Sequence, residues 1–148
     1  MLVLAHFFHN YILMAAVLSW ILAQIIKTVV TLIVTKRFDP ERILGAGGMP
    51  SAHSAMVCAL FVGVLRNCGA GSPEFALAFV FAGVVMYDAM GVRRAAGEQA
   101  RVLNKLVEIT EKNGAEITQK GLKESLGHTP MEVLAGIMLG ILVALAMG

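Results

Sequence analysis

Four long apolar segments constrain this chain more than any other feature of its sequence. We place them at about residues 11–34, 51–65, 75–92 and 131–147. A helix of about 20 apolar residues crosses the hydrocarbon core of a bilayer, where only helices and closed barrels satisfy their own backbone. Segment 51–65 is short for a full span and suits a helix that starts below the membrane surface. The sequence therefore predicts an all-α integral membrane bundle with about four membrane segments.

The composition supports a membrane protein and argues against nucleic-acid binding. Hydrophobic residues make up 57% of the chain and charged residues 15%, whereas a soluble domain usually has about a quarter charged residues. The net charge is only +2, which is too small to indicate a nucleic-acid partner. No repeat or low-complexity stretch divides the chain, so we expect a single membrane domain over residues 1–148.

The charged residues concentrate between Arg93 and Glu124. Within this stretch, residues 94–112 have apolar side chains on roughly one side and charged side chains elsewhere, which predicts an amphipathic helix. We expect this helix to lie on the membrane surface or to pack over the bundle.

The lysines and arginines also predict an orientation. With four spans, the loop around residues 36–50 and the segment 93–128 lie on one side of the membrane and carry most of the basic residues, whereas the other side has Arg66. The positive-inside rule then places both polar loops in the cytoplasm and both termini outside, as in a bacterial inner membrane.

Two histidines occur at predicted helix starts on this same side. His53 lies within Met49-Pro50-Ser51-Ala52-His53-Ser54, and His128 precedes Thr129-Pro130-Met131-Glu132. Helix N-termini offer unpaired N–H groups and a partial positive charge, which favour phosphate. Histidine can transfer a proton near neutral pH or attack phosphorus. The simpler alternative is that both histidines only cap or anchor their helices.

Two charged residues near these histidines allow two interpretations each, and a third needs a partner. Glu132 is four residues after His128 and either orients its ring, as in a catalytic triad, or only completes a capping box with Thr129. Lys27 either extends to the membrane interface or points inward at an anion. Asp88 is costly in a membrane segment unless it is paired, and arginines follow it closely. A zinc site formed by His53, His128 and Glu132 matches no compact zinc motif, so we expect neither a metal nor a cofactor.

These residues resemble motifs of the type 2 phosphatidic acid phosphatases, a superfamily related to the vanadium-dependent haloperoxidases. Pro50-Ser51-Ala52-His53 is similar to their Pro-Ser-Gly-His motif, and His128-x-x-x-Glu132 is similar to their His-x-x-x-Asp motif. Together with residues 88–94, these blocks resemble the divergent bacterial and plant branch. The resemblance implies that His128 is the nucleophile that forms a phosphohistidine, that Glu132 is its carboxylate partner and that His53 is the general acid.

The chain departs from the superfamily pattern in two motifs and in length. The superfamily has an arginine six residues before its nucleophile, where this chain has Leu122 between basic residues. The superfamily's lysine-containing first motif has no clear copy, and Lys27, Lys36, Arg93 or Arg94 are the candidates to replace it. The chain is also shorter than the usual six-helix core, so either a pair of chains completes the structure or the site is simpler. The phosphate-binding residues predicted from the resemblance and from these candidates are Ser51, Lys27, Arg93, Arg94 and Lys123.

The sequence therefore predicts a membrane phosphatase that hydrolyses a lipid or isoprenoid phosphate monoester or diphosphate. The alternative is a non-catalytic relative that binds or transports a phosphorylated lipid or anion. A third interpretation is a structural protein that assembles through the face of Gly136 and Gly140, a spacing that allows close helix contact. We expect the partners to be the lipid phosphate substrate, membrane lipids and further copies of the chain, for example in a dimer.

Overall fold

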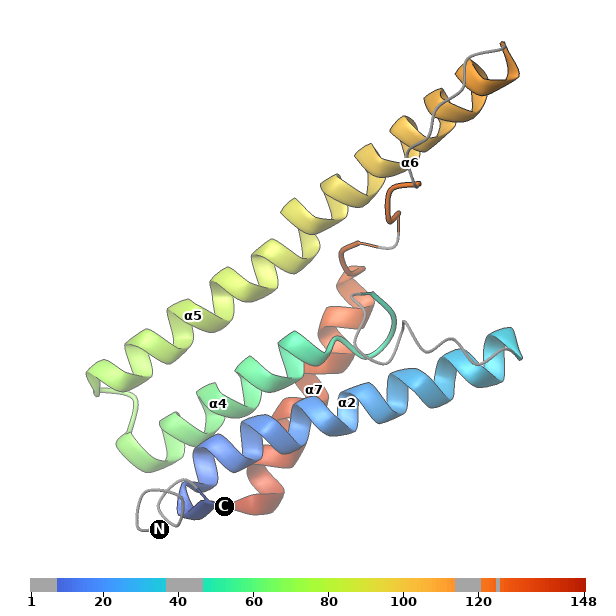
Figure 1. Ribbon diagram of the computed structural model, residues 1–148. Coiled ribbons are helices and arrows are strands. Elements are labelled where there is room, and N and C mark those ends of the chain that lie inside the picture. The colour runs from blue at the N-terminus through green and yellow to red at the C-terminus, as the bar shows by residue number, and fades with distance from the viewer. Residues whose placement is uncertain (1–7, 37–46, 114–120, 125) are drawn as a thin grey trace.

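The computed structural model describes residues 8–36, 47–113, 121–124 and 126–148, and in these residues it is helical apart from the connecting loops. The five long helices of this part (Figure 1) are α2 (Tyr11–Thr35), α4 (Ala52–Cys68), α5 (Pro73–Met90), α6 (Val92–Lys112) and α7 (Pro130–Met147). By length and composition, α2, α7 and the 40-residue stretch of α5 and α6 can each cross a membrane, whereas α4 has 17 residues. The predicted helical membrane bundle is confirmed.

Each helix of the bundle begins at a polar side chain that caps its first turn. The capping oxygen accepts a hydrogen bond from a backbone N–H that has no partner inside the helix. In α5 and α7 a proline at the first helical position adds a residue whose backbone is already suited to helix entry. The capping residues are Asn10, Ser51, Ser72 and Thr129.

Helix α4 lies at the centre of the bundle, in contact with α2, α5 and α7. Its contacts are close because small residues meet there. The hydroxyl of Ser19 in α2 donates to the carbonyl of Ala55 over 3.1 Å. On α7, a Cβ atom added to Gly136 would lie 2.4 Å from the carbonyl oxygen of Ser51, and one added to Gly140 would lie 2.3 Å from that of Ala55. The two glycines thus allow α7 to pack closely against α4 of the same chain.

This contact corrects the interpretation that Gly136 and Gly140 assemble separate chains. Their face of α7 is covered by α4, because both glycine positions are buried and lie against the α4 backbone. The close helix approach that the spacing predicts is therefore present, but it joins two helices of the same chain.

One of the two predicted placements of α6, over the bundle, is wrong, because among the described helices α6 contacts only α5. Figure 1 shows α6 continuing along the line of α5 and projecting from the bundle. Gly91 connects the two helices, its N–H donating to the carbonyl of Tyr87 and its carbonyl accepting from Ala95. Hydrogen bonding continues through this junction, so α6 extends beyond the bundle instead of folding back over it.

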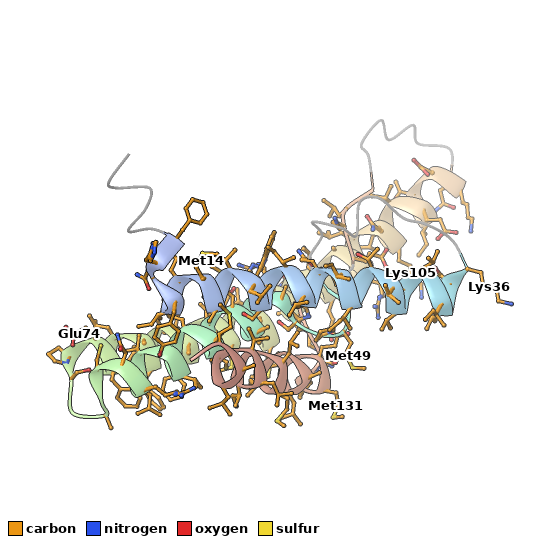
Figure 2. The ribbon with its side chains drawn as sticks, turned by 90° about the horizontal axis from the view of Figure 1, so that it is seen from below. Met14, Lys36, Met49, Glu74, Lys105 and Met131 are labelled. Atoms are coloured by element: carbon orange, nitrogen blue, oxygen red, sulfur yellow. The ribbon has the colours of Figure 1, made fainter. Side chains whose placement is uncertain are left out.

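The ends of the helices place the polar loops together. Helix α2 ends, α4 begins, α5 joins α6 and α7 begins at one end of the bundle, while α2 begins and α7 ends at the other (Figure 1). Figure 2 shows the same separation, with Lys36, Met49, Lys105 and Met131 toward one end and Met14 and Glu74 toward the other. His53 and His128 therefore belong to the same end, as the sequence predicts.

The contact between α4 and α7 can be tested by adding a methyl group. We expect Gly140→Ala to lower the free energy of unfolding by about 1–3 kcal/mol, because the new Cβ overlaps the Ala55 carbonyl. Gly83→Ala in α5 is the matched control, since nothing lies within 4 Å of an added Cβ there. Thermal unfolding in detergent measures both. Equal tolerance of the two substitutions would contradict this packing.

Candidate functional site

The backbone on either side of His128 holds the imidazole in the protein interior. The N–H of His128 donates to the carbonyl of Ala89 in the last turn of α5 over 2.9 Å. The side chain of His128 is only 5% exposed. Gly127 has a φ of +87°, and a Cβ there would lie 2.4 Å from the backbone nitrogen of Arg94. Only glycine therefore lets the chain approach the start of α6 at this point.

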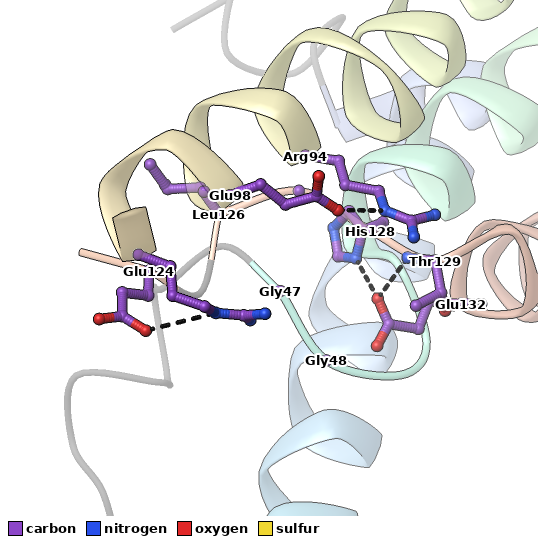
Figure 3. A pocket seen from close by; sticks show the side chains of 12 residues that line it. Gly47, Gly48, Arg94, Glu98, Glu124, Leu126, His128, Thr129 and Glu132 are labelled. Atoms are coloured by element: carbon purple, nitrogen blue, oxygen red, sulfur yellow. Dashed lines mark hydrogen bonds and ion pairs between the residues drawn. The ribbon is translucent and has the colours of Figure 1, made fainter. Parts of the chain in front are cut away.

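Glu132 binds the ring of His128 and caps α7 with the same carboxylate. Its Oε2 lies 3.0 Å from Nδ1 of His128 and accepts the N–H of Thr129 over 3.1 Å (Figure 3). The N–H of Glu132 donates to the hydroxyl of Thr129 over 3.3 Å. The two interpretations of Glu132 are therefore both met. With its proton on Nδ1, His128 keeps Nε2 unprotonated and able to attack.

Ser51 connects the start of α4 to the start of α7. Its N–H donates to the carbonyl of Glu132 over 2.9 Å, and its hydroxyl oxygen accepts from the hydroxyl of Ser54 over 3.0 Å. Ser51 is fully buried and lines neither of the two cavities around His128. The structure thus gives the Ser51 oxygen to the cap of α4 rather than to a ligand cavity.

The larger cavity beside His128 has a volume of about 410 Å³ and is polar. Two ion pairs cross its wall, Arg94 with Glu98 at 3.5 Å and Arg101 with Glu124 at 3.6 Å. Figure 3 shows Arg94 and Glu98 beside His128, Glu124 farther along the cavity, and Gly47 and Gly48 on the loop that borders it. The cavity therefore offers arginines, but each is partly neutralised by a carboxylate.

The smaller cavity, of about 230 Å³, contains both histidines. Its charged wall is formed by Arg93 and Asp88, whose Nε and Oδ2 atoms are 2.5 Å apart. Its other wall is apolar and comes mainly from α5. The structure thus brings together four predicted site residues around one space. The lining residues are His53, Val84, Val85, Asp88, Ala89, Arg93, Gly127 and His128.

Lys27 points into the bundle, which agrees with the second of its two interpretations. It is 3% exposed, and its side chain passes against Gly48, where an added Cβ would lie 3.2 Å from the Lys27 Cγ and Cδ atoms. Lys27 and Arg93 both lie within electrostatic reach of His53. Lys27 therefore places a buried amine near the smaller cavity.

Lys123 and Leu122 lie away from both cavities. Lys123 is exposed and lines neither of them. The N–H of Leu122 donates to the side-chain oxygen of Asn104 over 2.8 Å, which holds this residue along α6. Leu122, at the position of the superfamily arginine, thus lies against α6 and not beside His128. The arginines that the structure places beside His128 are Arg93 and Arg94.

Sequence reasoning missed several residues of the larger cavity, among them Gly97, Glu98, Arg101 and Glu124. A Cβ at Gly97 would lie 2.7 Å from the carbonyl oxygens of Glu124 and Leu126. A glycine inside an amphipathic helix is destabilising without a packing reason, so Gly97 was a signal of this contact. Among the described residues, no group of three His, Cys, Asp or Glu side chains is arranged to hold a metal ion.

Comparison with known proteins gives two similarities. A sequence model of the divergent PAP2 family matches residues 8–143. The uncharacterized membrane protein YuiD of Bacillus subtilis (strain 168) is 43% identical over an alignment of 148 positions that covers 93% of this chain and 94% of that protein. No solved structure matches the chain. An integral membrane location agrees with both the helices and this relative.

The role of Gly97 can be tested through the segment it contacts. We expect Gly97→Ala to displace Glu124 and Leu126 from α6 at a cost of about 1–3 kcal/mol, because the methyl group overlaps their backbone carbonyls. Trypsin should then cleave after Lys123 faster than in the unchanged protein. Gly121→Ala is the control, since its Cβ would meet only Asn104 at 3.8 Å. Unchanged cleavage in Gly97→Ala would contradict the contact.

Proposed function

Because the chain belongs to the divergent PAP2 family, we propose that it is a membrane phosphatase acting through a phosphohistidine. Its substrate is a lipid or isoprenoid phosphate monoester or diphosphate. The observation that carries the proposal is the 3.0 Å contact between His128 Nδ1 and Glu132 Oε2, beside a cavity that His128 shares with His53. A buried ring that is held by a carboxylate and shares a cavity with a second histidine suits nucleophilic catalysis.

In the first step, Nε2 of His128 attacks phosphorus and the bond from phosphorus to the leaving oxygen breaks. His53, in its protonated form, gives its proton to that oxygen, so that an alcohol or a lipid monophosphate leaves. The ring of His128 becomes positively charged as the phosphorus–nitrogen bond forms. The Glu132 carboxylate at Nδ1 stabilises this charge.

In the second step, water attacks the phosphorus of the phosphohistidine. His53, now neutral, accepts a proton from the water, and the phosphorus–nitrogen bond breaks. Inorganic phosphate leaves, and His128 and His53 return to their starting forms. One water is consumed for each ester or anhydride bond that is hydrolysed.

The cations around the histidines balance the charge of the transferred phosphoryl group. Arg93 lies at the smaller cavity and Arg94 at the larger one, both in the first turn of α6. Asp88 fixes the guanidinium of Arg93, and the buried charge of Lys27 lies behind His53. Arg93, Arg94 and Lys27 thus supply the positive charge that the superfamily arginine, absent here at Leu122, would give. The apolar wall of α5 in the smaller cavity suits a hydrocarbon tail.

One feature of the site favours a second candidate function, the binding or transport of a phosphorylated lipid or anion without hydrolysis. Arg94 and Arg101 are paired with Glu98 and Glu124, which leaves less positive charge for a transition state. This candidate predicts saturable binding of phosphate ligands by the purified protein with no release of inorganic phosphate.

The basic residues support an orientation in which the site faces the cytoplasm. Cys68 is exposed at the end of α4, on the side of the bundle opposite to the site. We expect a membrane-impermeant maleimide to label Cys68 in cells whose outer layers have been removed and whose inner membrane is intact. It should not label a cysteine introduced by Lys105→Cys in a chain that also carries Cys68→Ser. Labelling in the reverse pattern would contradict this orientation.

The proposed reaction predicts distinct losses in three variants. With purified protein and a panel of lipid phosphates, His128→Asn should abolish phosphate release, and His53→Asn should lower kcat by about 10²–10⁴-fold. Glu132→Gln keeps a residue that completes a capping box but removes the charge, and should lower kcat by about 100-fold or more. Thermal unfolding of each variant separates a loss of activity from a loss of fold.

Lys123→Ala is the matched control, because Lys123 lies in the segment before His128 but lines neither cavity. Its activity should stay near that of the unchanged protein. Phosphate release that survives in His128→Asn would contradict the proposed nucleophile. Tight binding without release, in every well-folded form, would favour the second candidate function.

A further inference from the structure

One side of α6 exposes an apolar stripe that no described part of its own chain covers. The side chains of Val92, Val102, Leu106 and Ile109 are between 48% and 63% exposed. The opposite side of α6 is covered by residues 121–124 and 126–127, where Gly97 and Ala100 are buried and Asn104 binds the Leu122 backbone. The helix thus has two packing faces, of which its own chain fills one.

The stripe has the spacing of a coiled-coil seam. Its members are separated by alternating intervals of three and four residues, which keeps them on one line when two helices wind around each other. A heptad repeat of this kind fits the surface of another helix, whose side chains form the matching holes. The seam positions are Val92, Ala95, Gln99, Val102, Leu106 and Ile109.

A membrane surface does not suit this stripe. Figure 1 shows helix α6 continuing the direction of α5, and α5 is apolar enough to cross the membrane, so we expect α6 to extend out of the membrane and not along its surface. Gln99 lies in the middle of the stripe, where a polar amide weakens the burial of the helix among acyl chains. A coiled coil accepts a single polar residue at such a position.

A second copy of the chain would present its own α6 parallel to this one, as a two-stranded coiled coil needs. Copies inserted into one membrane in the same sense present α6 parallel and at equal height, which is the register of a parallel two-stranded coil. In such a coil the residues that flank the seam on one helix face the opposite flank of its partner. One flank carries Glu98, Lys105 and Lys112, and the other carries the uncharged Ala96, Leu103 and Thr110. No like charges therefore meet across the pair.

We propose that two copies of this chain associate through a parallel coiled coil of their α6 helices, with Val102, Leu106 and Ile109 at its centre. The stripe spans about three heptads, which is short for a coil in solution, but confinement in one membrane raises the effective concentration of the partner. The pairing also fixes the first turn of α6, which carries Arg93 and Arg94. This inference does not depend on the proposed phosphatase activity.

Disulfide cross-linking in native membranes tests the seam. The full chain with Cys58→Ala and Cys68→Ser carries one new cysteine, either Val102→Cys in the seam or Glu111→Cys, which is exposed on the opposite side of α6. We expect mild oxidation to give a cross-linked dimer with Val102→Cys and little with Glu111→Cys. Equal cross-linking at both positions would indicate random collision and would overturn the proposal, as would none at either.

A second measurement keeps the test independent of cysteine chemistry. Leu106→Lys places charges at the centre of the seam, and we expect light scattering in detergent to show monomers where the unchanged protein shows dimers. Lys105→Ala, beside the seam, should stay dimeric. Circular dichroism verifies that both variants keep their helices. A dimer that persists in Leu106→Lys would show that the stripe is not covered by a second α6.

Discussion

The close approach of α7 to α4 determines where the site forms. Gly136 and Gly140 bring the two helix backbones into contact, and the Ser51 N–H then reaches the Glu132 carbonyl. Helix association in a membrane relies on such packing, because lipid tails are as apolar as the side chains they replace. With the first turns of α4 and α7 fixed side by side, His53 and His128 enter the same space from different parts of the sequence.

The polar groups at this end of the bundle are held by contacts that also serve the fold. Glu132 completes the cap of α7 and binds the His128 ring, and the His128 N–H closes onto α5 through Ala89. A charged group in an apolar surrounding is costly unless it is paired. Each charge here that supports the proposed chemistry therefore has a structural partner, which limits its movement and keeps the site ordered before a ligand binds.

The fold class and the placement of the two histidines at one end of the bundle could be predicted from the sequence, because apolar length and helix-start signals are local properties. The direction of α6 was not predictable in the same way, since it depends on whether hydrogen bonding continues through Gly91. Ser51 and Lys123 were assigned to phosphate binding by resemblance and by charge, but the structure places one inside a helix cap and the other on an exposed segment. Gly97 was visible as a helix-breaking residue, although its partner carbonyls lie more than 25 residues away along the chain.

The central claim is that His128 attacks phosphorus directly, and the stereochemical course at phosphorus tests it most directly. A lipid phosphorothioate ester made chiral at phosphorus with two oxygen isotopes would be hydrolysed by the purified protein in water of the third isotope, and the configuration of the inorganic thiophosphate would be determined by phosphorus NMR. Two successive in-line displacements through a phosphohistidine predict overall retention. Inversion would show that water attacks the substrate in a single step, and would contradict the role assigned to His128 and its contact with Glu132.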